Sequence, residues 1–386
     1  MHICLICSEL AGLVRPISGF GVATRSLAEL MVNAGHQVSV IVLDSKKART
    51  TTSAELSHIK VYRVRRSNVL TSGQLFREID ADIFHSQQPS LVSFAAQRSR
   101  PDAKHVVTCR DPHLVGDWIT EFLYPDVNRA GVLRAVAFYA GPLVASAVRR
   151  ADLIAAAAPH LVHKVKILYG LNDTPVHLPT PVKMRQDTAK SDRPTVCYVG
   201  RLDGRKRPDL LLKVAAATPE IKFLVVGTSS AAARDREIRS KLACLENVEL
   251  AGFVDQFTDP LHSKVFSRSW MLLNTSAREG LPISFLEAAA HGCAIVSRVD
   301  PDGFATRFGA CAADGNFAGA LRGLIRTGAW RERGELAQRY VETTYSEDCA
   351  IAAHLNQYER ILAQSRRPNL LTKKSAAARR LPVATN

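Results

Sequence analysis

The sequence has no long uninterrupted apolar run. The nearest candidate, residues 130–158, is broken by three arginines and an aspartate. A membrane-spanning helix needs about 18 or more consecutive apolar residues, so we expect no transmembrane helix. The first residues, Met1–Ser8, form a short apolar run without a positive flank, and we therefore expect no signal peptide.

Cysteine is present, but not in a pattern that indicates a metal centre. The 8 cysteines are scattered, and only Cys4 and Cys7 form a C-x-x-C pair, with no second pair to complete a site. Both fall in an apolar strand pattern, where residues three apart point to opposite faces of the sheet. We therefore expect buried structural thiols, a reducing cytoplasmic location and no bound metal.

Acidic residues are in the minority, at 36 against 51 lysines and arginines, which gives a net charge of +15. This excess suits an anionic partner: nucleotide phosphates, an acidic lipid surface or nucleic acid. No recognition helix, zinc finger or aromatic RNA-binding pattern is visible, so nucleic acid is not the expected partner. Residues 365–386 hold lysines and arginines without acidic residues, and their composition predicts a disordered basic tail.

The chain divides into two similar halves. Its 386 residues exceed the size at which one hydrophobic core usually stops growing, so we expect two domains. A strand, a glycine turn, a helix and a second strand open the first half, which is the βαβ pattern of a parallel sheet. The first half is predicted to have strands at 2–7, 37–43, 59–64, 83–85, 105–108 and 153–157, with a helix at 22–34.

A proline-rich stretch at 174–182 indicates a hinge, after which the same pattern restarts. Ligands of such doubly wound sheets bind beyond the carboxyl ends of the strands, so the cleft between two facing units is the default site. The second half is predicted to have strands at 195–199, 222–226, 248–250, 270–274 and 294–297, with helices at 209–217 and 283–291.

Two groups of polar residues follow strands of the second half. Arg201 and Lys206 lie on a loop after Gly200, where the two cations could hold a diphosphate, although a solvated basic loop has the same pattern. Glu279 precedes a turn and a helix whose free N–H groups would attract a phosphate. Glu287 lies on that helix, where it could accept hydrogen bonds from sugar hydroxyls; acid–base hydrolysis and a plain surface glutamate are the alternatives.

Weaker candidates lie in the first half. The turn Ser18–Gly21 has two glycines of a dinucleotide fingerprint but Thr24 in the third place, so it could be only a tight turn. His85 and His113 follow apolar strands and could act as bases or bind hydroxyls. A histidine at a strand end is more often a structural hydrogen-bonding residue.

Together and in this order, the motifs resemble the retaining GT-B glycosyltransferases of family 4, from residue 1 to about residue 362. The most specific parts are 200–206 and 279–287. The resemblance implies an α/β, GT-B fold of two facing Rossmann-like domains with an interdomain cleft and a C-terminal crossover helix. The implied parts are 1–183 for the acceptor, 184–344 for the donor, 345–364 for the crossover helix and 365–386 for the basic tail.

The resemblance also implies roles for individual residues. Arg201, Lys206 and Glu279 are the implied catalytic residues, which hold the donor diphosphate and sugar and neutralise the diphosphate as it leaves. No cofactor and no metal is implied, and no Asp-x-Asp signature follows a strand. The implied donor-binding residues are Gly19, Gly21, Gly200, Phe253, Val254, Gly280, Leu281, Pro282, Ile283 and Glu287.

The implied reaction moves a sugar, with retention of its anomeric configuration, from a nucleotide-diphosphate sugar to a hydroxyl. The acceptor would be a glycan, a lipid-linked molecule or a small-molecule glycoside. The basic segments 46–49 and 63–66, the stretch 130–150 and the tail could also rest on an anionic membrane, so that the protein would be cytoplasmic and peripheral. Solvated surface charge is the alternative.

Two positions depart from the family pattern. The family usually has His-Asp where this chain has Arg110-Asp111, so the usual histidine contact to the donor sugar is missing, and Arg110 or His113 would replace it. Thr180 stands where asparagine is commoner. We thus expect acceptor or sugar contacts from His85, Arg110, Asp111 and His113. Rival functions are an epimerase or phosphorylase on this fold, or a non-catalytic nucleotide-sugar or nucleic-acid binding protein.

Overall fold

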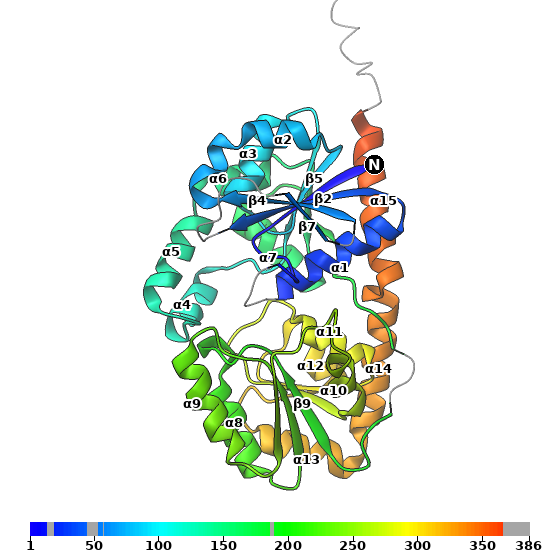
Figure 1. Cartoon of the computed structure of the whole chain (residues 1–386). Coiled ribbons are helices and arrows are strands. Elements are labelled where there is room, and N and C mark those ends of the chain that lie inside the picture. The colour runs from blue at the N-terminus through cyan, green and yellow to red at the C-terminus, as the bar shows by residue number, and fades with distance from the viewer. Residues whose placement is uncertain (14–18, 45–52, 57, 186–188, 366–386) are drawn as a thin grey trace, which may run out of the picture.

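The computed structural model describes residues 1–13, 19–44, 53–56, 58–185 and 189–365. These residues form two α/β units that lie one above the other, each built on a mainly parallel sheet (Figure 1). Each sheet has a hydrophobic core on both faces, which accounts for the nearly continuous apolar strands. The predicted pair of facing α/β units is confirmed.

The first unit contains a sheet of order β3-β4-β2-β1-β5-β6-β7-β8, in which only the β3–β4 pairing is antiparallel within the described ranges. Its core on one face lies under α1, and that on the other face lies under α2 and α3. Its strands are β1 His2–Cys7, β2 Gln37–Asp44, β3 Ser53–Leu56, β4 Ile59–Arg65, β5 Ile83–Ser86, β6 Lys104–Cys109, β7 Leu153–Ala156 and β8 Val176–His177. Its helices are α1 Gly19–Asn33, η1 Arg66–Thr71, α2 Gly73–Ile79, α3 Leu91–Ser99, α4 Val115–Leu123, α5 Arg129–Tyr139, α6 Pro142–Arg149 and α7 Pro159–Tyr169.

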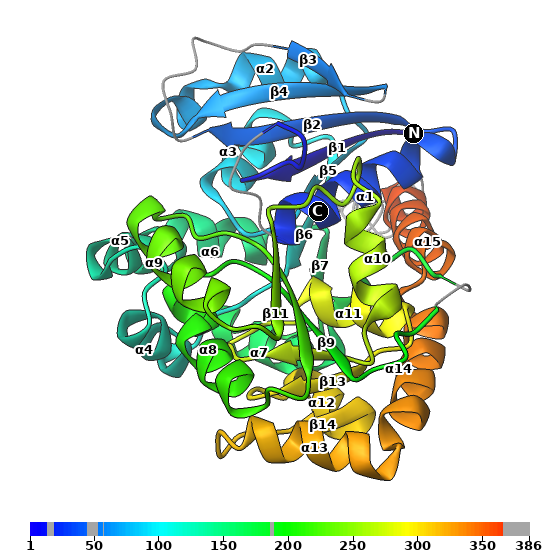
Figure 2. The same cartoon turned by 60° about the horizontal axis from the view of Figure 1, so that its bottom comes forward.

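The second unit contains a parallel sheet of order β11-β10-β9-β12-β13-β14 (Figure 2). Its strands are β9 Thr195–Val199, β10 Lys222–Val226, β11 Val248–Gly252, β12 Met271–Asn274, β13 Ala294–Ser297 and β14 Gly309–Cys311. Its helices are η2 Gly204–Lys206, α8 Pro208–Ala217, α9 Ala232–Ala243, α10 Leu261–Arg268, α11 Ile283–Ala290, η3 Pro301–Gly303, α12 Phe304–Phe308, α13 Phe317–Thr327 and α14 Ala329–Tyr345, and the chain continues into α15 Glu347–Ser365.

The chain crosses between the two units twice, near Val182 and after Tyr345, and a backbone hydrogen bond connects the two crossing segments. Leu178 packs in the core of the first unit, whereas Val182 packs in the core of the second. The Val182 N–H donates to the Tyr345 carbonyl at 2.8 Å, where the chain turns back. Helix α15 then packs on α1 and buries Tyr358 and Ile361 in the first unit, as a crossover helix does (Figure 1).

Several elements differ from the sequence-based expectations. The glycine turn expected before the first helix is part of it, because α1 begins at Gly19 and contains Gly21. The last helix begins at Glu347 rather than at 345. The pattern does not predict α4 and α5, because neither has a buried residue and so neither carries a core-facing apolar stripe. Ser18, residues 46–49 and 366–386 lie outside the described residues.

All eight cysteines are free. Cys4 and Cys7 lie in separate cores on opposite faces of the first sheet, as the strand pattern predicts. In the described ranges no single helix is long and apolar enough to cross a membrane. Helices α5 and α6, bent by 47° at their break, meet the length and composition limits only as a pair.

Candidate active site

A cavity of about 590 Å³ lies between the two units. Its walls follow the carboxyl ends of strands in both sheets, where doubly wound folds bind their ligands. Of the residues predicted for the site, those that line this cavity are Gly19, Arg110, Asp111, Gly200, Arg201, Phe253, Val254, Lys206, Glu279, Gly280, Leu281, Pro282, Ile283 and Glu287.

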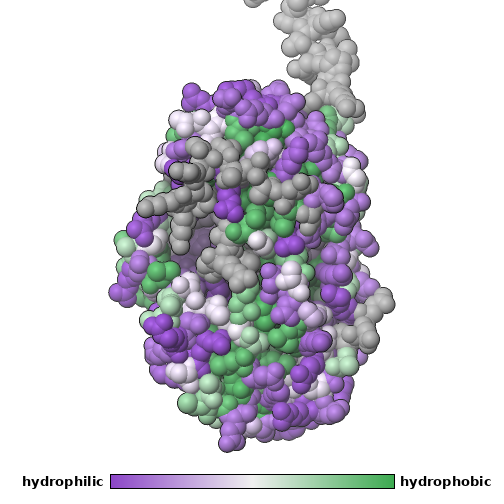
Figure 3. All heavy atoms as spheres, in the orientation of Figure 1, coloured by the Kyte–Doolittle hydropathy of each residue, from purple (hydrophilic) through white to green (hydrophobic). Residues whose placement is uncertain are grey.

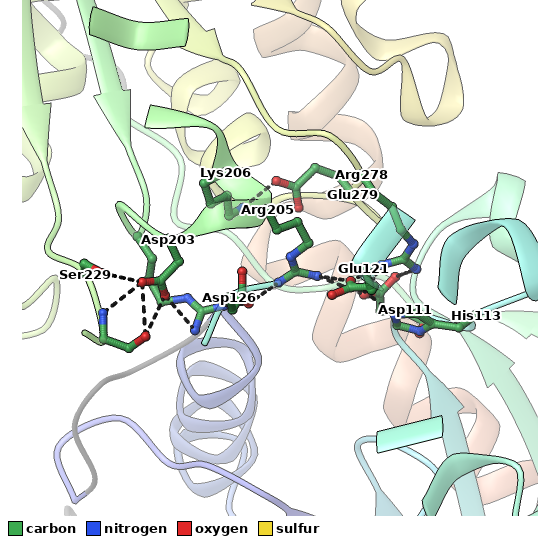
Figure 4. A network of polar contacts seen from close by, with 12 residues as sticks. Asp111, His113, Glu121, Asp126, Asp203, Arg205, Lys206, Ser229, Arg278 and Glu279 are labelled. Atoms are coloured by element: carbon green, nitrogen blue, oxygen red, sulfur yellow. Dashed lines mark hydrogen bonds and ion pairs between the residues drawn. The ribbon is translucent and has the colours of Figure 1, made fainter. Parts of the chain in front are cut away.

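Lys206 and Glu279 form an ion pair at the wall of the cavity (Figure 4). Lys206 comes from the 3₁₀ turn after β9, and Glu279 comes from the loop after β12. Burial alone would raise the pKa of Glu279, but Lys206 and Arg205 outweigh it and hold this pKa below its usual value. The pair therefore presents an ionised carboxylate and an ammonium to the same space.

Two further arginines reach across the cleft to carboxylates of the first unit. Arg201 contacts Asp126 at 2.7 Å and Asp203 at 3.3 Å. Arg205 contacts Glu121 at 2.9 Å and Asp126 at 3.5 Å. Glu121 lies on α4 and Asp126 in the loop after it. Carboxylates of the first unit therefore form ion pairs with the arginines of the second unit. A diphosphate offers the same charge and the same acceptor oxygens, and could replace these carboxylates.

Asp203 fixes the loop that carries these cations. It is fully buried and accepts hydrogen bonds from the Ser229 hydroxyl at 2.6 Å and the Ser230 N–H at 2.9 Å (Figure 4). Ser229 and Ser230 follow β10 and line the cavity. The contact thus ties the loop after β9 to the loop after β10, which holds Arg201 and Lys206 in place.

The turn before α11 approaches the first unit closely. A Cβ at Gly280 would lie 3.0 Å from the Arg110 carbonyl oxygen and from Asp111 Oδ1, and a Cβ at Gly19 would lie 3.1 Å from Ile283 Cδ1. Pro282 is the N-cap of α11 rather than its first helical residue. The N–H groups at the start of α11 therefore lie at the cavity wall, where they favour an anion.

Glu287 lines the cavity one turn into α11. Burial raises its pKa, and His262, with Nε2 3.7 Å from Glu287 Oε1, opposes this effect in part. Phe253 and Val254 follow β11 and line the same cavity, and Phe253 is 38% exposed. This end of the cavity therefore combines an apolar surface with a carboxylate.

Arg278 links the two units through three carboxylates, two of which, Asp111 and Glu121, are seen in Figure 4. It contacts Asp111 at 2.5 Å, Asp117 at 2.8 Å and Glu121 at 3.3 Å, and its side chain is 6% exposed. Burial alone would raise the pKa values of Asp111, Asp117 and Glu121, but Arg278 and other cations lower all three below their usual values. Asp111 thus lines the cavity as predicted, and it also forms an ion pair with Arg278 of the other unit.

Gly21 and the two predicted histidines do not line this cavity. A Cβ at Gly21 would lie 3.2 Å from Glu9 Cβ, so this glycine packs against the loop after β1. His85 is fully buried, with one ring nitrogen bonded to the Tyr358 hydroxyl at 2.5 Å and the other to the Thr108 hydroxyl at 2.7 Å. The structure contradicts the expectation that His85 contacts a substrate, because one ring nitrogen is bonded to Tyr358 of α15, the other to Thr108 of β6, and the side chain lies away from the cavity.

His113 lies beside a second, smaller cavity of about 110 Å³. Its ring stacks on Trp118 with centroids 4.2 Å apart, and its Nδ1 bonds to the Asp111 carbonyl at 2.8 Å. Arg110, Asp111 and Phe20 line both cavities, so the two spaces adjoin. His113 can therefore contact a molecule in the second cavity rather than one in the first.

Arg205, Arg278, Glu121 and Asp126 are site residues that the sequence reasoning missed. Arg205 and Arg278 directly precede Lys206 and Glu279, and that adjacency was the available signal. Glu121 and Asp126 gave no signal, because their partners lie in the other unit.

Comparison with known proteins agrees with this geometry. Residues 17–182 match the family Glycosyltransferase Family 4, and residues 180–308 match the family Glycosyl transferases group 1. A relative from Arabidopsis thaliana, one of the subunits of phosphatidylinositol N-acetylglucosaminyltransferase, is 31% identical over 141 residues, which cover 35% of this chain and 29% of that protein. The chain therefore matches less than a third of the length of that relative.

Solved structures share the whole fold at low identity. Sucrose-phosphate synthase from Thermosynechococcus elongatus has a TM-score of 0.70 at 17% identity, covering 95% of this chain and 100% of that one. The pneumococcal O-GlcNAc transferase GtfA, in complex with UDP and GlcNAc, has a TM-score of 0.70 at 11% identity, covering 94% and 99%. The two consecutive family matches, together with this shared fold, support a GT-B glycosyltransferase.

Proposed function

We propose that the protein transfers a sugar from a nucleotide-diphosphate sugar to a hydroxyl acceptor, with retention of configuration. One observation carries the proposal: Arg201, Arg205 and Lys206 line one cavity together with the start of α11. Such a set of preorganised charges and dipoles stabilises a diphosphate as its negative charge develops in the transition state. The neighbour crystallised with UDP and GlcNAc supports a donor of this kind.

In this mechanism the donor sugar lies in the cavity beside the Glu279–Ile283 turn and the Arg110–Asp111 segment, both of which line it. The bond from the anomeric carbon to the leaving phosphate oxygen breaks, and the acceptor oxygen forms a new bond on the same face. The acceptor proton passes to the leaving phosphate. Lys206 and the arginines supply the positive charge at the diphosphate, so we propose that neither a metal nor another cofactor is needed.

The acceptor enters from the first unit. The second cavity adjoins the first at Arg110 and Asp111 and is lined by the aromatic side chains Trp118 and Tyr139. Aromatic faces suit sugar rings and apolar groups alike. A glycan, a lipid-linked molecule or a small-molecule glycoside therefore all remain candidate acceptors, and the relative named for a phosphatidylinositol substrate supports a lipid-linked one.

Stereochemistry at the anomeric carbon tests the reaction type. The chain is incubated with UDP-, GDP- and ADP-sugars of α configuration and an acceptor mixture, and the anomeric proton of the product is followed by NMR. We expect one donor to give an α-linked product together with free nucleoside diphosphate. A β-linked product would contradict retention, and the absence of turnover with every donor would contradict the transferase assignment.

Glu287→Gln should stabilise the protein and weaken nucleotide binding. Because burial raises the pKa of Glu287, the fold favours its protonated form, and the ionised form destabilises the fold as pH rises above that pKa. At neutral pH the amide removes this cost and should raise the melting temperature. Loss of a charged acceptor for ribose hydroxyls should weaken nucleotide binding about tenfold.

The exposed Glu249→Gln is the matched control for this change and should alter neither quantity, since Glu249 lies on the surface of β11. Calorimetry gives both readouts. A lower melting temperature with unchanged nucleotide affinity for Glu287→Gln would mean that Glu287 is only a structural residue.

We further propose that α4 and α5 rest on an anionic membrane surface. Val115, Ile119 and Leu123 recur every four residues along one face of α4 and are 76%, 57% and 58% exposed. Val127 and Leu133 extend this face, and apolar surface appears where α4 and α5 lie at the left edge of the molecule (Figure 3). Nearby exposed arginines, at 129, 134, 149 and 150, suit acidic headgroups.

This face adjoins the cavity, because Asp126 in the loop between α4 and α5 contacts Arg201. The double variant Ile119→Glu/Leu123→Glu should therefore bind vesicles containing phosphatidylglycerol at least about tenfold more weakly than the native chain. Co-sedimentation with these vesicles measures the binding of each variant. Leu70→Glu, at a 60% exposed site on η1, is the control and should bind as the native chain does. Equal binding by the double variant would refute the proposal.

A further inference from the structure

Arg110 differs from the other cations of the cavity. Arg201, Arg205 and Lys206 line the cavity and each contacts a carboxylate. Arg110 lines the same cavity, yet in the described part of the chain it forms no ion pair. It is therefore the one lysine or arginine of the described cavity wall whose charge has no carboxylate against it.

The partners of Arg110 are neutral. Its Nη1 donates to the Thr180 hydroxyl at 2.7 Å and its Nη2 donates to Gln87 Oε1. Nε is buried and has no hydrogen-bond partner among the described residues. A guanidinium has five N–H donors, so two of them fix the side chain and the rest stay available. Burial lowers the pKa of Arg110 to about 10, which still leaves it a cation at neutral pH.

The fold alone gives no reason for this charge. A buried cation without a counter-charge is costly, and two neutral acceptors offset that cost only in part. The two departures from the family pattern, Arg110 and Thr180, contact each other, which indicates that they belong to one arrangement. Hydrogen bonds to two neutral acceptors do not require a cation, which indicates that the charge itself has an anionic partner to bind.

Arg110 also lies where a transferred sugar would contact it. Its backbone faces the turn at Gly280 across the cleft, and it lines both the large and the small cavity. We propose that Arg110 is a specificity-determining residue that binds a carboxylate of the substrate, so that the enzyme uses a uronate-type sugar. Arginine binds carboxylates with two parallel hydrogen bonds, which gives both affinity and orientation.

This inference rests on the proposed function, and the carboxylate can belong to either substrate. On the donor it would be the uronate group of the transferred sugar, held between Arg110 and the Glu279–Ile283 turn. On the acceptor it would be an acidic sugar in the second cavity. Both cases share the same chemistry, a carboxylate opposite a guanidinium, and the experiment separates them.

The test compares probe pairs that differ only in the carboxylate. Donor binding to the full chain is measured by calorimetry with UDP-glucuronate against UDP-glucose and with GDP-mannuronate against GDP-mannose. Acceptor use is measured with 4-nitrophenyl glucuronide against 4-nitrophenyl glucoside. The variants are Arg110→Gln, which removes the charge, and Arg110→Lys, which keeps it. The melting temperature and the affinity for free UDP and GDP report whether each variant is folded with an intact diphosphate site.

We expect the native chain to favour one acidic probe over its neutral partner at least about tenfold. Arg110→Gln should abolish this preference and Arg110→Lys should keep part of it, with unchanged affinity for free nucleoside diphosphate. A preference in donor binding identifies the donor, and one in transfer identifies the acceptor. If nucleoside diphosphate binds but neither acidic probe is favoured, the inference is overturned while the proposed function stands. If no nucleoside diphosphate binds, the proposed function fails, and the inference with it.

Discussion

Replacement of Lys206 by methionine is expected to lower kcat by about 100- to 1,000-fold. Lys206 lies at the cavity wall in contact with Glu279. In the proposed reaction this is where the departing diphosphate gains negative charge. An interaction that strengthens in the transition state affects kcat more than substrate binding. The affinity for free nucleoside diphosphate should therefore fall less, by about tenfold. Steady-state kinetics with the preferred donor and calorimetry with its nucleoside diphosphate measure the two effects.

Lys222→Met is the matched control. Lys222 also forms an ion pair, with Glu249 at 2.5 Å, but it lies at the amino end of β10, while the cavity lies beyond the carboxyl end. This variant should keep kcat within about twofold, because exposed ion pairs contribute little. A kcat for Lys206→Met within a few-fold of the native value would mean that Lys206 does not stabilise the leaving group.

Arg278→Met is expected to separate the two units rather than to unfold them. Removing one member of a buried ion-pair network leaves its partners uncompensated, at a cost of about 3 kcal/mol or more. Here Asp111, Asp117 and Glu121 belong to the other unit, so opening the cleft exposes their carboxylates to water, which solvates the uncompensated charge. The equilibrium between closed and open forms should shift by about 100-fold. Small-angle scattering should then show a larger radius of gyration, and kcat/KM should fall.

The pH dependence of this opening has a definite sign. In the native chain the three carboxylates have lowered pKa values, so their contribution to closure is complete at neutral pH and is lost as pH falls through those values. In Arg278→Met the burial that raises these pKa values is no longer opposed by Arg278. Lys164 still lowers the pKa of Asp117, and His113 and Arg205 still lower that of Glu121, so the pKa of Asp111 should rise most. Protonation of Asp111 on acidification should then favour reclosure of the variant.

Arg322→Met tests whether the effect is specific to the interface. Arg322 contacts Glu220 at 2.7 Å within the second unit, with side chains 52% and 51% exposed. Because this exposed ion pair contributes little to stability, its removal should leave both the melting temperature and the radius of gyration unchanged. If Arg278→Met stays closed at neutral pH, the ion-pair network does not hold the cleft shut.

Much of the fold was predictable because its signals are local. Each predicted strand is an apolar run that ends in glycine or polar residues, and the structure has a strand at every one of these places. β8 was missed because it has only two residues, Val176 and His177. Helices α4 and α5 were missed although α4 carries an apolar stripe of Val115, Ile119 and Leu123; this stripe faces outward in the structure, and neither helix has a residue buried in a core.

Only those site residues that lie close in sequence to a recognisable strand were predictable. Arg201, Lys206, Glu279 and Glu287 follow recognisable strand ends, and all four line one cavity. Of the acidic residues in the network, only Asp111 was predicted. Asp117 and Glu121 were not predictable, because their contacts with Arg278 join residues 161 and 157 positions apart in different units. His85 shows the opposite error. It lies at a strand end, but its partner Tyr358 arrives from α15, which no local pattern around residue 85 reveals.

The central claim is that the cations around the cavity hold the diphosphate of a sugar donor. Its most direct test is a calorimetric titration of UDP, GDP and ADP into the native chain and into Lys206→Met at one salt concentration. We predict that one nucleoside diphosphate binds the native chain with micromolar affinity and binds the variant about tenfold more weakly. Failure of all three to bind, or equal binding to both proteins, would contradict this account of the site.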